Sequence, residues 1–199
     1  MAISSGIFGD GSNFEQRNLA NYEVVAESVQ LLKALGLKIV LTAGSFDLIH
    51  EGHAQYLERA RQFGDLLITG VDSDDKIRHR KGPDRPIVPQ AERLRMLTHL
   101  RHVDLVVLKP LEAEKWALIK AVRPDVLVAT EETYTQDQIT ELERLYCGRV
   151  EVLPRMATTT TSARLRLLQL NLADRMTSRL ANQLPDIVRQ VIRDQIEGR

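Results

Sequence analysis

Two histidines lie three residues apart in the stretch GSFDLIHEGH, which follows a short apolar run. If a helix begins here, this spacing places His50 and His53 about one turn apart, pointing the same way. Gly52 has no side chain, so a ligand can approach the backbone closely. Unpaired N–H groups at a helix start attract phosphate, and two imidazoles beside them can donate hydrogen bonds to phosphoryl oxygens. The stretch therefore predicts phosphate chemistry.

A metal site and a structural cap are the two other interpretations of this histidine pair. HEGH differs from the zinc-protease motif H-E-x-x-H because its second histidine comes one residue early, and no third ligand is obvious. Two structural histidines could also cap a helix. Neither interpretation explains why Gly44, Asp47 and Gly52 accompany the histidines directly after a strand. We therefore assign no direct metal ligand.

Predicted strands and helices alternate along the chain on both sides of this motif. Short apolar runs predict strands, and apolar residues at helical spacing predict helices. Strands joined by helices form right-handed parallel units, and ligands bind at the carboxyl ends of such strands. The predicted strands are residues 39–41, 66–71, 103–108, 126–129 and a more exposed 150–153, and the predicted helices are residues 21–35, 54–63, 91–100, 111–122 and 135–146.

A basic, proline-broken loop is predicted at residues 76–90, after the polar strand end that begins at Asp72. An isolated run of this kind is more often a solvated loop. Because this one follows a strand on the predicted ligand edge, a clamp for a polyphosphate is favoured, with Lys81 and Arg85 among its cations.

A run of hydroxyl side chains, Thr158–Ser162, precedes the last predicted helical region. Such a run is often only a helix cap. The alternative is a second phosphate-binding helix N-terminus.

Composition limits the classes of partner. Lys plus Arg and Asp plus Glu both number 27, so no basic excess favours nucleic acid, and no basic amphipathic helix favours a membrane surface. No apolar run approaches the ~20 residues that span a bilayer. The single Cys147 fits a reducing compartment, and the N-terminal residues do not resemble a secretory signal. We expect a cytoplasmic protein that binds neither nucleic acid nor membrane.

Three regions are predicted in the chain. Residues 1–20 are expected to form a flexible arm, residues 21–169 the main domain, and residues 170–199 a helical extension. The extension has an apolar stripe that is interrupted around Pro185. Such a tail packs on its own domain or on a partner subunit, and we expect a homodimer or a higher homo-oligomer.

Taken together, these motifs resemble the cytidylyltransferase-like family of HIGH-motif nucleotidyltransferases, and within it the heptose-1-phosphate adenylyltransferase type. The family pattern T-N-G-C-F-D-x-L-H-x-G-H is similar to TAGSFDLIHEGH, and R-x-K-G…R-P…ER is similar to RHRKGPDRPIVPQAER. The strand entry G-G-R-V and helix start S-T-T-x are matched by CGRVEVL and TTTTSAR. The resemblance covers about residues 24–168. The chain departs from the pattern at Ala43, where asparagine is usual, and at residues 130–134, TEETY, where K-G-G-D-Y is usual.

The resemblance implies a Rossmann-like parallel sheet with helices on both faces, followed by C-terminal helices. It also implies transfer of a nucleoside monophosphate from ATP or CTP to a small phosphorylated or phosphonylated acceptor, with release of Mg²⁺-bound pyrophosphate. The alternatives are an FAD-synthetase-like or pantetheine-phosphate-like adenylyltransferase, and a nucleotide-binding regulator that has lost catalysis.

The resemblance also assigns roles to individual residues. His50, His53 and Lys81 are the implied catalytic residues, since they would hold the phosphates and stabilise the transition state. Asp72 could reach the ribose or a magnesium shell. The implied acceptor contacts are Asp47, which also stabilises the turn, Arg85 and Arg93. The implied nucleotide-binding residues are Gly44, Ser45, Phe46, His50, Gly52, His53, Asp72, Lys81, Arg85, Thr130, Thr160, Thr161 and Ser162.

Overall fold

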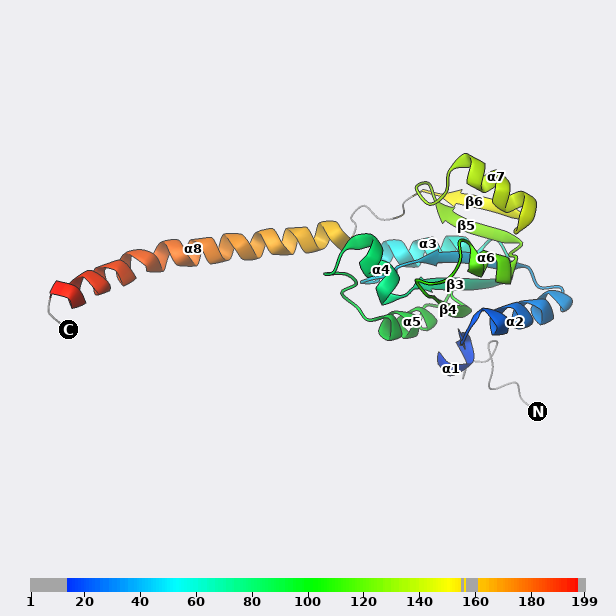
Figure 1. Ribbon diagram of the computed structural model, residues 1–199, viewed down its shortest axis with the longest axis horizontal. Helices are drawn as coiled ribbons and strands as arrows, with labels where there is room; N and C mark the ends of the chain where they lie inside the picture. The colour runs from blue at the N-terminus through cyan, green and yellow to red at the C-terminus, as the bar shows by residue number, and fades with distance from the viewer. Residues whose placement is uncertain (1–13, 155, 157–160, 197–199) are drawn as a thin grey trace. The chain divides into compact units, whose positions relative to one another are not determined.

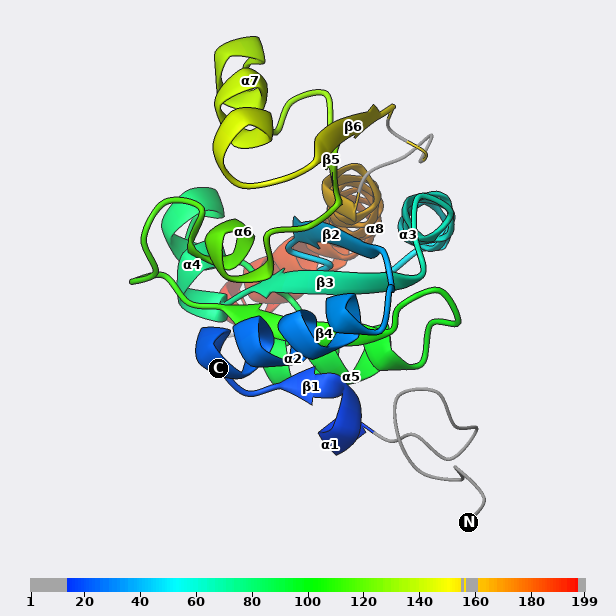
Figure 2. The same cartoon turned by 90° about the vertical axis from the view of Figure 1, so that its right-hand side faces the viewer.

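Six parallel strands form one sheet in the order β1-β4-β3-β2-β5-β6 (Figures 1 and 2). The computed structural model describes residues 14–154, 156 and 161–196. The chain divides into two compact units, Met1–Thr158, which contains the sheet, and Thr159–Arg199, which contains one long helix. The prediction of a Rossmann-like α/β fold is confirmed.

The elements follow one another in the alternating order that the sequence predicts. The strands are β1 (Asn18–Leu19), β2 (Ile39–Gly44), β3 (Leu66–Asp72), β4 (Leu105–Lys109), β5 (Val126–Thr130) and β6 (Arg149–Leu153). The helices are α1 (Phe14–Arg17), α2 (Tyr22–Ala34), α3 (Glu51–Arg61), α4 (Asp74–Lys81), α5 (Gln90–Thr98), α6 (Ala117–Val122), α7 (Gln136–Leu145) and α8 (Thr161–Ile196).

Alternate side chains of the strands enter two apolar layers, one on each face of the sheet. In β2, Ile39 and Leu41 belong to one layer and Val40 to the other, as the two-residue repeat of a strand requires. Helices α2, α6 and α7 contribute buried residues to the first layer, and α3 and α5 to the second. Both faces of the sheet are therefore covered by helices.

The structure corrects the predicted flexible arm at its C-terminal end. Phe14–Arg17 is a short helix, and Asn18–Leu19 pairs with β4 as the edge strand. Arg17 fixes this segment because it donates hydrogen bonds to the backbone carbonyls of Val103 and Asp104. Residues 1–13 lie outside the described part of the chain.

The basic loop prediction is also corrected, because residues 74–81 form helix α4. Ser73 caps this helix by accepting a hydrogen bond from Lys76 N at 3.2 Å. Acidic residues occupy its first turn and basic residues its last, which complements the helix dipole. The helix predicted over residues 111–122 is also shorter than expected. Only Ala117–Val122 is helical, since Trp116 before it has a left-handed φ of 63°.

Helix α8 runs through Pro185 without a break, although the sequence predicted an interruption there. The described side chains of residues 167–196 are all exposed. None of the described helices is long and apolar enough to cross a membrane.

The parallel arrangement brings the carboxyl ends of the central strands to one edge of the sheet. Gly44 ends β2 and is paired with Val71, while Asp72 ends β3 and is paired with Lys109 at the end of β4. Thr130 ends β5, on the other side of β2. The predicted phosphate motif therefore lies at the centre of the ligand-binding edge.

Candidate active site

The turn between β2 and α3 has an unusual backbone conformation. Phe46 and Leu48 have positive φ angles of 48° and 51°, in the left-handed region that non-glycine residues rarely occupy. Packing holds the first of them, because Phe46 is 4% exposed and its ring centroid lies 5.6 Å from that of His53. A Cβ atom on Gly44 would lie 3.2 Å from the Phe46 ring, so glycine suits this position.

His50 and His53 lie side by side at the start of α3, as their spacing predicts, with ring centroids 4.0 Å apart. His50 is the N-cap residue, and its Nδ1 accepts a hydrogen bond from Gly52 N at 3.1 Å. His53 Nδ1 accepts from His50 N at 3.3 Å. A neutral imidazole whose Nδ1 accepts carries its proton on Nε2. The cap and the phosphate-donor interpretations are therefore compatible, since capping through Nδ1 leaves each Nε2–H as a donor.

Burial, together with the neighbouring His50 and Lys81, lowers the pKa of His53 to about 4 against the opposing effect of Asp47. His53 is therefore neutral near pH 7 and acts as a hydrogen-bond donor rather than as a cation. Burial, Arg80 and Arg85 also lower the pKa of Lys81, which lies at the end of α4. The structure thus brings together the three residues that the sequence predicted as catalytic.

Asp47 ties the histidine turn to the segment after α4. Its Oδ1 accepts hydrogen bonds from Ile87 N and Val88 N, each at 3.0 Å. Its Oδ2 lies 3.1 Å from Arg85 Nη1, and the side chains are 4% and 13% exposed. These contacts hold the Asp47 side chain to the segment after α4, and its predicted role in the turn stays a prediction. The predicted contacts of Asp47 and Arg85 with the acceptor stay predictions.

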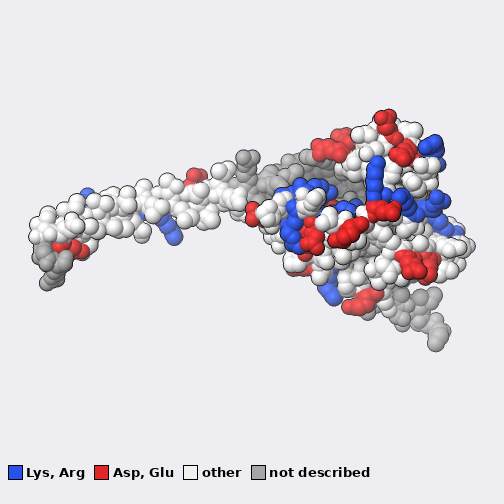
Figure 3. Space-filling model, in the orientation of Figure 1, with Lys and Arg blue, Asp and Glu red and all other residues white. Residues whose placement is uncertain are grey.

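Asp72 is the centre of a group of cations at the end of β3. Its side chain is 2% exposed, and its oxygens lie 2.9 Å from Arg80 Nη2 and 3.2 Å from Lys109 Nζ. Burial alone would raise the pKa of Asp72, but Lys109 and Arg80 outweigh it and lower the pKa. Arg80 also donates to Ser45 Oγ at 2.8 Å, which joins this group to the histidine turn. A space-filling view shows Lys and Arg atoms beside Asp and Glu atoms over α4 (Figure 3).

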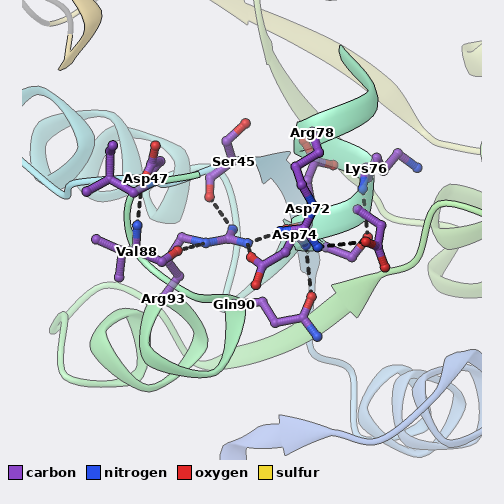
Figure 4. A network of polar contacts seen from close by, with 12 residues as sticks. Ser45, Asp47, Asp72, Asp74, Lys76, Arg78, Val88, Gln90 and Arg93 are labelled. Carbon is purple, nitrogen blue, oxygen red and sulfur yellow. Dashed lines mark hydrogen bonds and ion pairs between the residues drawn. The ribbon is translucent and has the colours of Figure 1, made fainter. Parts of the chain in front are cut away.

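Arg93 joins three segments of the site: the turn after β2, the junction of β3 and α4, and the segment before α5 (Figure 4). It is 1% exposed, and it donates to the carbonyls of Val88, Ser45 and Asp72 at 2.9, 2.5 and 2.8 Å. Its guanidinium also pairs with Asp74 Oδ1 at 2.7 Å. The predicted direct contact with the acceptor is corrected, because a side chain that is buried and bonded in this way positions other residues.

The remaining predicted nucleotide contacts differ in how far the structure describes them. Thr130 ends β5, and its hydroxyl lies 3.0 Å from that of Thr133. Thr161 begins α8 and Ser162 follows it, but their side chains are outside the described part of the chain, and Thr160 is wholly outside it. Their predicted contacts with phosphate stay predictions.

Sequence reasoning named Arg80 and Lys76 only as members of the basic stretch expected to clamp a polyphosphate, and it assigned no role to Lys109. Nothing in the pattern distinguished Arg80 from its neighbours. Lys109 could have been found from its position, since it ends the strand beside β3 at the ligand edge. The described residues hold no group of three or more His, Cys, Asp or Glu side chains that could bind a metal ion.

The sequence of this chain is similar to a known protein family and to known proteins. The sequence model of the family described as "Cytidylyltransferase-like" matches residues 41–166. The chain is 43% identical over 135 residues to "Bifunctional protein HldE" of Geobacter sulfurreducens, covering 67% of this chain and 27% of that protein. It is 36% identical over 157 residues to the protein of the same name from Magnetococcus marinus, covering 76% and 31%. The chain therefore spans less than a third of the length of these relatives.

A solved structure shares the fold. The crystal structure of the lipopolysaccharide core biosynthesis protein from Thermoplasma volcanium aligns with a TM-score of 0.52 and 25% sequence identity. The alignment covers 60% of this chain and 97% of that chain.

Proposed function

The chain belongs to the cytidylyltransferase-like family of nucleotidyltransferases, and from this membership we propose the reaction that its site performs. It transfers a nucleoside monophosphate from ATP or CTP to a small phosphorylated or phosphonylated acceptor and releases pyrophosphate. The observation that carries the proposal is the placement of His50 and His53 side by side near Lys81 at the carboxyl end of β2, with each Nδ1 accepting a backbone N–H.

The chemistry follows from where charge develops. An oxygen of the acceptor phosphate attacks the α-phosphorus, the bond between that phosphorus and the oxygen bridging to the β-phosphate breaks, and pyrophosphate leaves with that oxygen. The crowded phosphoryl oxygens gain negative charge during this step, and fixed donors stabilise it without reorganising. His53 supplies a neutral donor with His50 beside it, and Lys81 supplies a positive charge between the two substrates.

Mg²⁺ in this proposal accompanies the triphosphate. Asp47 of the motif is paired with Arg85, and Asp72 at the end of β3 is paired with Arg80 and Lys109, so these two carboxylates do not form a magnesium cage. Mg²⁺ commonly binds through substrate phosphates and water, which fits such a site. When bound, the ion neutralises charge on the departing pyrophosphate.

The similarity to the HldE proteins favours a phosphorylated sugar among the acceptors. The test is pyrophosphate release with Mg²⁺ and either ATP or CTP, across sugar phosphates, polyol phosphates, flavin mononucleotide, pantetheine phosphate and phosphonates. Release with one pair identifies both substrates. Nucleotide binding without release for every acceptor would favour the regulator alternative.

Replacing Lys81 with alanine is expected to raise the KM for the nucleoside triphosphate and to lower kcat, each by about tenfold, because a charge-assisted contact to phosphate is lost. Steady-state pyrophosphate release measures both constants. The exposed Arg78→Ala variant is the control, since its cation pairs with Asp75 on the outer surface of α4. Unchanged kinetics for Lys81→Ala would remove this residue from the site.

We also propose that α8 pairs with the same helix of a second copy. Leu180, Leu184, Ile187 and Val191 follow one another at spacings of four, three and four residues, and all are more than half exposed. Few charges appear on α8 in Figure 3. Deleting residues 170–199 is expected to halve the mass measured by light scattering. A full-length chain with the mass of a monomer, or a truncated chain of unchanged mass, would contradict this pairing.

A further inference from the structure

A second pocket lies at the ligand edge, on the opposite face of β2 from the histidines. Its volume is about 270 Å³, and Leu41 and Ala43 of β2 contribute to its wall. Thr42, between them, points to the other face, where its hydroxyl lies 2.7 Å from that of Tyr56 in α3. The described residues that line the pocket include neither histidine of the motif nor Lys81. The pocket and the histidine site are therefore separate spaces that share one strand.

Lysine side chains give this pocket an excess of positive charge. Lys76, Lys109 and Lys115 contribute to its lining, against one glutamate, Glu114. Glu114 is already paired, with Lys120 at 3.2 Å. Asp72 lies beside Lys109 but divides its charge between that lysine and Arg80. Glu112, which is not among the lining residues, also acts on Lys76. Among the side chains that line the pocket, three lysines therefore stand against one glutamate.

The position of each lysine limits what it can bind. Lys76 Nζ donates one hydrogen bond, to the carbonyl of Pro110 at 3.3 Å, which leaves two of its three donors for other partners or water. Burial and the neighbouring Lys109 lower the pKa of Lys76, against the opposing effect of Asp72. An anion bound between the two ammonium groups would relieve their mutual repulsion. Lys115 lies 4.0 Å above the Trp116 ring and covers it from outside.

The rest of the wall is aromatic and aliphatic. Trp116 and Tyr134 both contribute to it, and both pack against the apolar core beneath. The volume is just below the usual range for drug-sized ligands, so the pocket suits a small molecule. A nucleobase carries no negative charge and is read by amide and backbone groups, so a lysine-rich pocket fits it poorly. The chemistry of this wall instead fits a compact molecule with an anionic end.

Contacts between side chains connect this pocket to the reacting centre. Lys109 meets Asp72 at 3.2 Å, Asp72 meets Arg80 at 2.9 Å, and Arg80 meets Ser45 of the histidine turn at 2.8 Å. These contacts make the pocket and the histidine turn neighbours at the end of β2. Under the proposed function, the phosphate that attacks the nucleotide has to lie at the histidine end, next to Lys81.

Resting on that proposed function, we propose that the pocket holds the acceptor and that Lys76 and Lys109 bind a second anionic group of it. This group, a carboxylate or another phosphate, is separate from the phosphate that becomes nucleotidylated. The acceptor class is thus a small molecule with two anionic groups, one at each end.

The chain contains a built-in reporter for this pocket, because Trp116 is its only tryptophan. Three probes with the same three-carbon skeleton test the proposal: 3-phosphoglycerate has a phosphate and a carboxylate, glycerol 3-phosphate has only the phosphate, and glycerate has only the carboxylate. Each is titrated into the full-length protein to millimolar concentration while Trp116 emission is recorded. We expect 3-phosphoglycerate to bind about tenfold more tightly than either of the others, because one more charge-assisted hydrogen bond forms.

Variants separate the lysines from the rest of the protein. Lys76→Met is expected to remove the tenfold preference for 3-phosphoglycerate, and it leaves the Asp72–Arg80 pair in place. Lys109→Met is also expected to remove the tenfold preference for 3-phosphoglycerate. Lys33→Met is the matched control, since Lys33 pairs with Asp125 near the other end of the strands and should leave the preference unchanged.

The outcomes distinguish this proposal from the proposed function. Equal affinities for 3-phosphoglycerate and glycerol 3-phosphate, or no change in Trp116 emission with any probe, would overturn the second anionic group. A preference that survives both Lys76→Met and Lys109→Met would overturn its assignment to these lysines. His53→Ala is expected to keep the preference while losing turnover. If the preference is present but no acceptor releases pyrophosphate, the pocket assignment holds as a binding site and the proposed reaction fails.

Discussion

Replacing His53 with alanine is expected to lower turnover by about a hundredfold or more while the domain stays folded. The variant removes the Nε2–H donor that, in the proposed reaction, the neutral imidazole offers to the phosphoryl oxygens. His53 also accepts a hydrogen bond from His50 N at 3.3 Å, so a small loss of stability accompanies the loss of rate. Pyrophosphate release measures the rate, and thermal unfolding followed by circular dichroism measures the stability.

Two further substitutions at this position separate the cap from the donor. In His53→Asn the side-chain oxygen can still accept from His50 N, but nothing replaces Nε2–H, so we expect near-normal stability and a rate as low as that of His53→Ala. In His53→Gln the amide can place an N–H donor near the Nε2 position, so part of the rate should return. Wild-type turnover in either the alanine or the asparagine variant would refute the assigned role.

The sequence predicted the central part of this site because the information there is local. A strand, a glycine-containing turn and two histidines at helical spacing are contiguous, and the structure places them as predicted, at the start of α3. The double use of each imidazole, with Nδ1 as a cap and Nε2–H as a donor, could not be read from the pattern. It depends on backbone geometry in a turn where Phe46 and Leu48 have left-handed φ angles.

Contacts between distant segments account for what the sequence did not predict. Asp72 pairs with Lys109 because β3 and β4 are neighbours in the sheet, and Arg93 bonds to Ser45 because α5 packs on the same face of the sheet as α3. The edge strand β1 was missed for the same reason, since two residues carry no periodic signal and their partner lies in β4. Helix α4 was missed for a different reason. Its sequence is almost entirely charged, so it lacks the apolar spacing that predicts a helix, although Ser73 and the acidic first turn are cap signals that could have indicated it.

The substitution with the largest expected effect on stability is Arg93→Met. The buried guanidinium donates to three backbone carbonyls and pairs with Asp74, and methionine replaces none of these interactions. Removing one partner of a buried ion pair costs about 3–5 kcal/mol, because the remaining charge loses its partner. We expect a loss of stability in that range, measured by urea unfolding.

Arg93→Lys tests whether the charge or the fork of the guanidinium matters. A lysine keeps the charge but has one ammonium group in place of five donors, so it cannot meet Val88, Ser45 and Asp72 together. The control is Arg95→Met on the same helix, where the exposed side chain lies 3.7 Å from Glu15 and its loss should cost at most about 1 kcal/mol. If Arg93 positions the site, Arg93→Lys should stay folded in low denaturant yet lose kcat more than it raises the KM for the triphosphate. Equal changes in stability and in kcat for the Arg93 and Arg95 variants would mean that the hydrogen bonds of Arg93 do not position the site.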